Sequence, residues 1–258
     1  MINWMAETDK QDTSSASRLP GLFGEIVAAV GTTEGLDDRV LTSHWPLMGR
    51  NFDHGVLVIG QAVYGWITEW TAADTRKPGG VDAIVEDSRR IFADRADSMD
   101  WIDGHRVENS PFWRTAHEVV DALTPGTAPW YSRLAWANLY PVAPNDVKGN
   151  PEGALRVVQT EPAARFLDAL IDELDPRLVL VLAGPFVWPF VAPLGLDGLE
   201  RAEAPFTFVG MRGGRPWISG MHPGGAQRRG WPARKYASLI VDRARTLIRD
   251  AGTAPVAL

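Results

Sequence analysis

The chain has 258 residues, of which 45% are hydrophobic, and its formal net charge at pH 7 is −6. This length suits one large domain. The acidic balance argues against a protein that coats nucleic acid indiscriminately, although it allows a local basic patch. The absence of cysteine excludes disulfides, thiolate zinc sites and cysteine-ligated iron–sulfur clusters. We therefore expect no metal or other cofactor, and a cytoplasmic protein.

Residues 1–19 are polar and rich in Ser, Thr and Asp, which predicts a flexible N-terminal arm. No linker composition interrupts residues 20–258, so a single domain is expected there. The longest uncharged stretch, residues 178–196, has the length of a membrane span. Because one glycine and three prolines interrupt it, we expect a buried strand that runs into a turn, and no contact with a membrane.

The domain is predicted to begin with a helix over residues 22–30, where apolar residues recur at helical spacing. Residues 31–54 are expected to be irregular. They contain His44 and His54, which are ten residues apart with no third ligand near them in sequence. No metal site is therefore predicted in this segment.

The next segment, residues 55–60, is a β-branched and aliphatic run typical of a strand buried on both faces of a parallel sheet. Residues 66–110 form a charged insertion containing tryptophans, with one helix expected near residues 81–92. A further helix is predicted over residues 111–123, where a proline suits the first turn.

The second half continues the alternation of strands and helices. The expected elements are a strand over 134–140, a loop over 141–153, a helix over 162–174, strands over 178–182 and 217–220, and a helix over 233–249. This order predicts a three-layer α/β/α sandwich with a central, mainly parallel four-stranded sheet.

Polar or glycine-rich motifs follow these strands, at the sheet edge where α/β proteins bind ligands. They are Gly60-Gln61-Ala62-Val63-Tyr64, Ala137-Asn138-Leu139-Tyr140-Pro141 and His222-Pro223-Gly224-Gly225, with Ser110-Pro111-Phe112 at the start of a helix. Six cations lie on either side of the histidine and no carboxylate lies between them: Arg212, Arg215, Arg228, Arg229, Arg234 and Lys235. A histidine in such surroundings suits stabilisation of a developing anion beside a phosphate backbone.

Together these motifs resemble those of the uracil-DNA glycosylase superfamily over residues 55 to 245. The resemblance implies that the loop holding Gln61 and Ala62 positions the attacking water, and that Phe112 stacks on an extruded base. It further implies that Asn138 reads the polar edge of the base, that His222 stabilises the departing base, and that the six cations bind DNA. The similarity is closest to the bacterial and archaeal branches with iron–sulfur clusters, whose cysteines this chain lacks.

The first motif departs from the common pattern, because neither Gln61 nor Ala62 can act as a base. Glu69 and Asp74 are possible substitutes that lie nearby in sequence. Tyr64 matches a tyrosine that crowds the C5 position and so favours uracil. Alternatively, a small Ala62 and a large insertion would open the pocket for a bulky modified pyrimidine, as in phage-defence glycosylases that excise glucosylated hydroxymethylcytosine.

The resulting hypothesis is a monomeric, monofunctional DNA glycosylase, acting on single- or double-stranded DNA and leaving an abasic site. No lysine lies in the motifs to form a Schiff base, and the nearest is Lys148. One alternative is a catalytically silent protein of the same fold that binds DNA or a base. Another is an unrelated α/β enzyme acting on a nucleotide or other small molecule.

Overall fold

The computed structural model describes residues 17–63, 66–103, 107–145 and 150–253. Tyr64, Lys148 and most of the predicted N-terminal arm lie outside these residues. Among the described helices, none is both long enough and apolar enough to cross a membrane.

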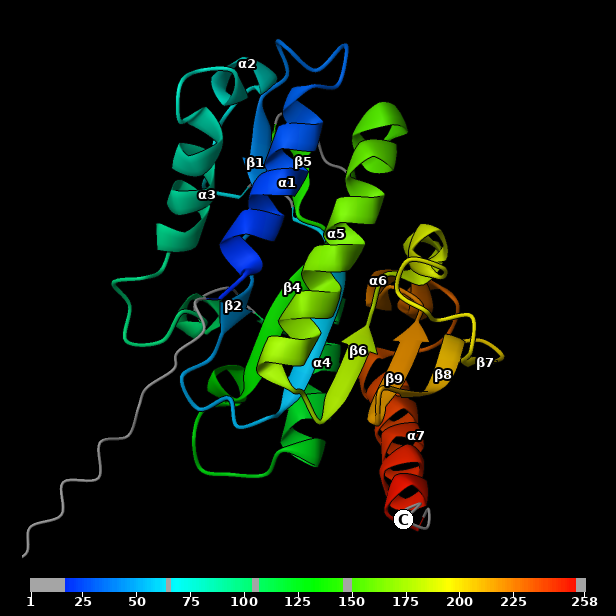
Figure 1. Ribbon diagram of the computed structural model, residues 1–258. Helices are drawn as coiled ribbons and strands as arrows, with labels where there is room; N and C mark the ends of the chain where they lie inside the picture. Colours follow the sequence, from blue (N-terminus) through cyan, green and yellow to red (C-terminus); the bar gives the residue numbers. More distant parts are fainter. Residues whose placement is uncertain (1–16, 64–65, 104–106, 146–149, 254–258) are drawn as a thin grey trace, which may run out of the picture.

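A mixed sheet occupies the centre of the described chain, with its strands in the order β2-β4-β3-β6-β9-β8-β7 (Figure 1). Its strands are β2 (Leu47–Met48), β3 (Val56–Ala62), β4 (Leu134–Tyr140), β6 (Leu178–Val181), β7 (Glu200–Arg201), β8 (Phe206–Arg212) and β9 (Arg215–Gly220). A separate antiparallel ladder joins β1 (Leu41–Ser43) to β5 (Val142–Pro144).

The four predicted strands are the adjacent strands β4, β3, β6 and β9, and they run parallel to one another. The expected size of the sheet was wrong, because antiparallel strands extend it at both edges to seven strands in the described residues. β2 and β7 are only two residues long, and β8 has only two buried residues, Phe208 and Val209, so none forms a continuous buried apolar run. The prediction of an irregular segment over residues 31–54 was also wrong, since it contains β1 and β2.

Helices cover both faces of the sheet. They are α1 (Leu19–Gly31), α2 (Ala72–Thr75), α3 (Gly80–Arg90), α4 (Pro111–Leu123), α5 (Gly153–Leu174), α6 (Pro223–Arg228) and α7 (Ala233–Thr253), with short 3₁₀ turns η1 (Asp100–Ile102), η2 (Val107–Asn109), η3 (Trp130–Arg133) and η4 (Gly184–Phe190). The helix expected at 162–174 begins earlier, at Gly153, so Pro162 lies inside it. Proline usually marks the start of a helix because it lacks an N–H. Pro162 is instead an interior residue of α5, and it is buried.

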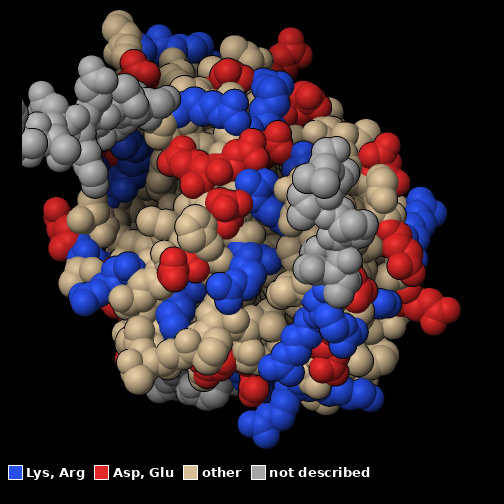
Figure 2. All heavy atoms as spheres, turned by 60° about the horizontal axis from the view of Figure 1, so that its bottom comes forward, with Lys and Arg blue, Asp and Glu red and all other residues tan. Residues whose placement is uncertain are grey.

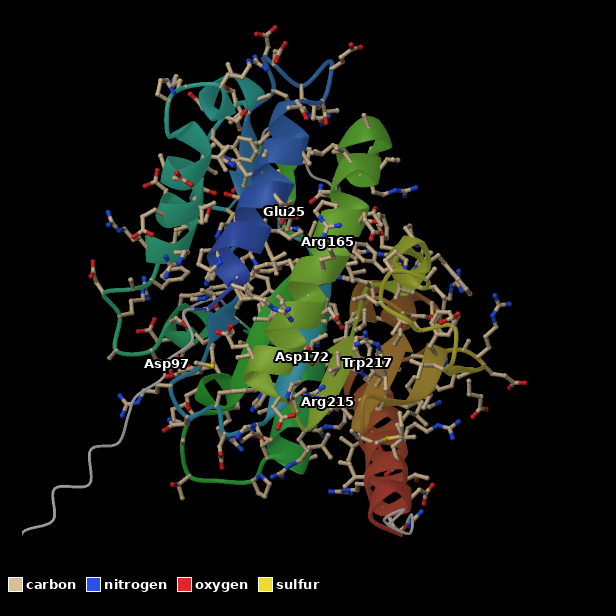
Figure 3. The ribbon with its side chains drawn as sticks, in the orientation of Figure 1. Glu25, Asp97, Arg165, Asp172, Arg215 and Trp217 are labelled. Carbon is tan, nitrogen blue, oxygen red and sulfur yellow. The ribbon has the colours of Figure 1, made fainter. Side chains whose placement is uncertain are left out.

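Alternate residues of each strand supply two separate hydrophobic cores. On β3, Leu57 and Ile59 pack on the side of α1 and α5, whereas Val56 and Val58 pack on the side of α4 and α7. Figure 1 shows α1 and α5 crossing one face of the sheet. An ion pair of 2.6 Å between Glu25 and Arg165 joins these two helices (Figure 3).

The segment predicted as an insertion contributes to both cores. Trp70 and Ile84 belong to the core beside α1, and Met99 and Ile102 belong to the core beside α4. Apolar packing therefore holds this segment against the sheet. Among the described residues, no group of His, Asp or Glu side chains could hold a metal ion.

Candidate active site

The predicted motifs meet in one pocket of about 540 Å³ at the carboxyl ends of the parallel strands. Gln61, Ala62, Phe112, Asn138 and His222 all line it. The chain runs from β3 to β4 on one side and then places β6 and β9 on the other side of β3. Such a reversal of strand order opens a crevice, which is where open α/β sheets bind ligands.

Asn138 lies near the end of β4, directly beside Gly60 of β3. A Cβ atom at Gly60 would lie 2.6 Å from the Asn138 side-chain oxygen, so glycine is needed for this close approach. The amide of Asn138 is 3% exposed, and its nitrogen lies 3.1 Å from Nδ1 of His44. A buried histidine therefore holds one end of the amide that was predicted to read a base.

His44 was overlooked as a site residue because it was considered only as a metal ligand. It follows β1, and its backbone N–H donates to the carbonyl of Pro141, which extends the β1–β5 ladder and brings it beside the end of β4. Its ring is 1% exposed and packs 4.2 Å from Trp136 and 4.9 Å from Trp66. Burial lowers the pKa of His44 to about 3, so the ring is neutral at pH 7 and Nδ1 can accept from the amide of Asn138.

His222 is fixed by contacts on both sides of it. The Tyr236 hydroxyl donates to the carbonyl of Met221 at 2.9 Å, and a Cβ atom at Gly220 would lie 2.2 Å from that hydroxyl. Nδ1 of His222 accepts from the backbone N–H of Gly224 at 3.2 Å. In the neutral ring the proton therefore lies on Nε2, which can donate.

The charge state of His222 follows from its surroundings. Burial lowers the pKa of His222, and the positive charge of Arg228 lowers it further. A neutral donor is consequently present at pH 7. Such a donor can stabilise an oxygen that gains negative charge without itself needing to transfer a proton.

Phe112 reaches the pocket from the first turn of α4. Ser110 caps this helix, with its hydroxyl oxygen accepting from the Trp113 backbone N–H at 3.3 Å. The Phe112 ring lies 6.0 Å from the His222 ring, with 22° between the two planes. A Cβ atom at Gly60 would lie 3.6 Å from the Phe112 ring, which is an ordinary van der Waals contact, so the ring packs directly against this part of β3.

We call this hollow the aromatic pocket, because an aromatic wall forms much of its lining beside Val63, Ile67, Arg95 and Ser110. The wall consists of Trp66, Phe92, Trp101, Trp113 and Trp136. Their rings pack on one another, mostly edge to face, with centroids 5.0 to 6.3 Å apart. Trp66, Phe92 and Trp101 come from the segment over residues 66–110, and the only sequence signal for the two tryptophans is the high total of eleven in the chain.

No carboxylate lines the aromatic pocket among the described residues. The side-chain N–H of Gln61 donates at 3.0 Å to the carbonyl of Ala183, which lies just after the neighbouring strand β6. Glu69 instead accepts from Asn145 at 2.8 Å. Asp74 caps α2, and its bonds to Lys77 and Thr71 lower its pKa to about 2. Neither acid therefore lies where it could activate water in this pocket.

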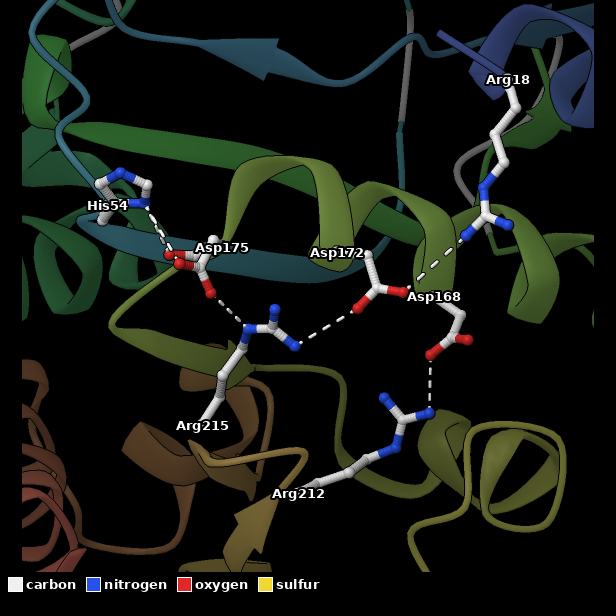
Figure 4. Close-up of polar contacts among 7 residues, drawn as sticks. All are labelled: Arg18, His54, Asp168, Asp172, Asp175, Arg212 and Arg215. Carbon is white, nitrogen blue, oxygen red and sulfur yellow. Dashed lines mark hydrogen bonds and ion pairs between the residues drawn. The ribbon is translucent and has the colours of Figure 1, made fainter. Parts of the chain in front are cut away.

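The six predicted cations separate into groups. Arg212 and Arg215 lie at the turn between β8 and β9, at the opposite end of β9 from His222. There they pair at 2.6 to 3.3 Å with Asp168 and Asp172 of α5 and with Asp175, which caps that helix (Figure 4). Basic and acidic side chains are interspersed on the face that Figure 2 shows, so that face is not a continuous basic surface.

The remaining cations follow His222 in sequence, from the last residue of α6 onward. Arg234 pairs with Glu118 at 3.3 Å, and the Lys235 ammonium lies 4.8 Å from the Trp231 ring centroid. Arg228 and Arg229 line a second hollow of about 820 Å³, which we call the arginine groove.

The arginine groove adjoins the aromatic pocket, because Gln61 and His222 line both. Its other described lining comes from η4, the segment from β7 to β8, the start of α6, and Asn150 before α5. Arg201, Arg228 and Arg229 are its charged residues, and no carboxylate lines it in the described parts of the chain. One hollow is thus mainly aromatic and the other cationic, with a histidine and an amide at their boundary.

Comparison with known proteins gives no family: no protein-family model matches the chain, and a search of curated proteins finds no significant relative. Function must therefore be inferred from the geometry of these two hollows.

Proposed function

We propose that the protein is a monofunctional DNA glycosylase that hydrolyses the N-glycosidic bond of a flipped-out uracil or modified pyrimidine and leaves an abasic site. The observation that supports this most strongly is the junction of the two hollows at Gln61 and His222. A flipped nucleotide has an aromatic base and an anionic backbone, joined by the bond to be cleaved. Its base suits the aromatic pocket and its phosphates suit the arginine groove.

The chemistry requires little more than these groups. As the C1′–N bond breaks, its electron pair goes to the base, and the sugar becomes an electrophile resembling an oxocarbenium ion. Water then adds its oxygen to C1′, and one of its protons ends on the base. In this proposal Nε2 of His222 donates to the base oxygen as it becomes anionic, and Gln61 orients the water. A lost donor of this kind typically lowers the rate about 10²–10³-fold.

Recognition of the base is assigned to Phe112 and Asn138. Stacking on an aromatic ring contributes about 1–3 kcal/mol per base. With one N–H of its amide directed to His44, Asn138 keeps an oxygen and a second N–H for a ligand. An acceptor and a donor side by side match the pairing edge of a pyrimidine.

The volume of the aromatic pocket supports a substrate larger than uracil. The small Ala62 lines the same pocket as the aromatic wall, and the volume of about 540 Å³ falls in the range of sites for drug-sized ligands. A pyrimidine with a bulky C5 substituent, such as glucosylated hydroxymethylcytosine, would fill this space more completely than uracil.

The test is an excision assay on single strands and duplexes that contain uracil, hypoxanthine, hydroxymethylcytosine or its glucosylated form. Alkali-labile abasic sites at one base would establish the reaction and its substrate. His222→Ala should lower the rate at least about a hundredfold. His117→Ala is the matched control, since His117 is on the surface of α4 and lines neither hollow. A rate for His222→Ala within a few-fold of the wild-type rate would remove His222 from the mechanism.

A second function is favoured by one observation, the lack of a carboxylate among the described residues of the aromatic pocket. Without a base to activate water, the same two hollows would serve a protein that binds DNA or a base and does not cleave it. Tight DNA binding together with no abasic product from any substrate would favour this function.

A further inference from the structure

The arginine groove contains an aromatic feature that the proposed reaction does not use. Trp188 of η4 lines it and is 44% exposed, although tryptophan is usually largely covered. The guanidinium of Arg201, on β7, lies over this indole at 5.1 Å from the ring centroid. Phe208 packs against the same indole edge to face at 5.1 Å and is itself 2% exposed.

This arrangement is a stacking platform that is fixed on one side. Phe208 anchors the indole to the core, and the flat guanidinium of Arg201 lies over the ring. Exposed aromatic rings and guanidinium planes next to a positively charged groove are the features with which proteins bind unpaired nucleotides, by stacking on the base and contacting the phosphate.

We infer that the arginine groove binds single-stranded DNA: a nucleotide next to the flipped one stacks its base on Trp188 and Arg201, while Arg228 and Arg229 contact the intervening phosphates. The inference rests on the proposed function in one respect, since it takes the aromatic pocket as the place of the flipped base. The strand would then pass from the aromatic pocket into the arginine groove across the boundary at Gln61 and His222.

The partner is a single strand rather than a duplex for two reasons. In a duplex each base is already stacked on its neighbours, so a platform gains contact only with an unpaired base. Duplex binding also depends on many phosphate contacts over a broad basic surface. The cations of the β8–β9 hairpin are instead paired with α5, and the chain is acidic overall.

The test measures binding of a labelled oligothymidylate of about 12 nucleotides, within the length that such grooves span. It contains no base to be excised, so catalysis does not enter. Trp188→Leu and Trp188→Phe are the matched pair, because both keep an apolar group against Phe208 and only phenylalanine keeps an aromatic face. We expect Trp188→Leu to weaken binding about tenfold and Trp188→Phe to recover most of it.

Arg228→Gln should flatten the salt dependence, because Arg228 is assigned a phosphate contact: the slope of log affinity against log salt should fall by about 0.7 for a single strand. Arg212→Gln is its control, because Arg212 pairs with Asp168 and lies outside the groove. A perfectly paired duplex of the same length should bind more weakly than the single strand. Neither Trp188 variant should change the affinity for this duplex.

Three results would overturn the inference: wild-type affinity in Trp188→Leu, equal losses in the Leu and Phe variants, or tighter binding of the duplex. Failure of the proposed function looks different. Excision together with unchanged binding in Trp188→Leu would refute the strand path alone. Strand binding that depends on Trp188, with no excision of any base, would refute the glycosylase and keep the groove.

Discussion

Replacement of His44 by glutamine should change how the stability of the protein depends on pH. Burial lowers the pKa of His44 from its ordinary value of 6.5 to about 3. Because the folded-state pKa is lowered, the neutral ring stabilises the fold fully above pH 6.5. That contribution is lost as the pH falls from 6.5 towards 3, since the unfolded chain then binds one more proton than the folded chain.

The magnitude follows from this difference. At pH 4.5, two units below the ordinary pKa and still above the folded value, the loss is about 2.7 kcal/mol at roughly 1.36 kcal/mol per unit. Glutamine has no such titration. At pH 7.5 we expect His44→Gln to be less stable by about 1–3 kcal/mol, because it leaves Trp66 and Trp136 without the ring that packs between them. At pH 4.5 that deficit should disappear or reverse.

The assay is urea unfolding of both proteins, followed by tryptophan fluorescence, at pH 7.5 and pH 4.5. Both values avoid the isoelectric point near 5.4, where association is favoured. Subtracting the wild-type free energy of unfolding from that of the variant cancels every other titrating group. An equal difference at the two pH values would refute the reasoning, since His44 would then have the same pKa in both states.

Three further results are expected from the site. Gly60→Ala should destabilise the protein by about 1–3 kcal/mol and lower excision, because the new methyl group would lie 2.6 Å from Asn138. Thermal unfolding would measure this loss. The control is Gly126→Ala, where the nearest atom to the new methyl group is 3.7 Å away. Arg212→Ala should leave DNA affinity within about twofold of wild type and lower stability by at most about 1 kcal/mol, measured by salt-dependent binding and urea unfolding. The excision rate of the wild-type protein should stay constant as the pH falls to 6.5 and should decline only at lower pH, because the lowered pKa of His222 keeps its ring neutral. A decline in rate centred at pH 6.5 would contradict this.

The parallel centre of the fold could be predicted because each of its strands is buried on both faces. Short continuous apolar runs bounded by turn residues, such as residues 178–182, are typical of such strands, and the carboxyl ends of parallel strands must share an edge. The same rule also brings Gln61, Asn138 and His222 to one place. It needs no knowledge of side-chain contacts, which is why it succeeds for residues at strand ends.

Sequence patterns failed where a residue depends on a distant partner. His44 belongs to the site only because β1 pairs with β5, about a hundred residues later, and a three-residue strand leaves little trace in a sequence. Arg212 and Arg215 belong to a basic window in sequence, yet their partners are carboxylates on α5 and at its C-terminal cap, some 40 residues earlier. Local charge cannot show which cations are neutralised, because the neutralising helix face is not local.

The lack of a carboxylate in the described lining bears on the rate of the proposed reaction more than on its nature. Full deprotonation of water is needed only when the electrophile is weak, and a sugar that has already lost its base is a strong one. An amide that holds a water molecule in place is then sufficient, since a correctly oriented water can attack C1′ without first losing a proton to a base. Gln61 is suited to this role because Ala183 occupies one of its N–H groups and fixes the amide. The departing base must in turn be stabilised more strongly, and that demand falls on His222. Substitution of His222 should therefore cost this protein more than substitution of Gln61.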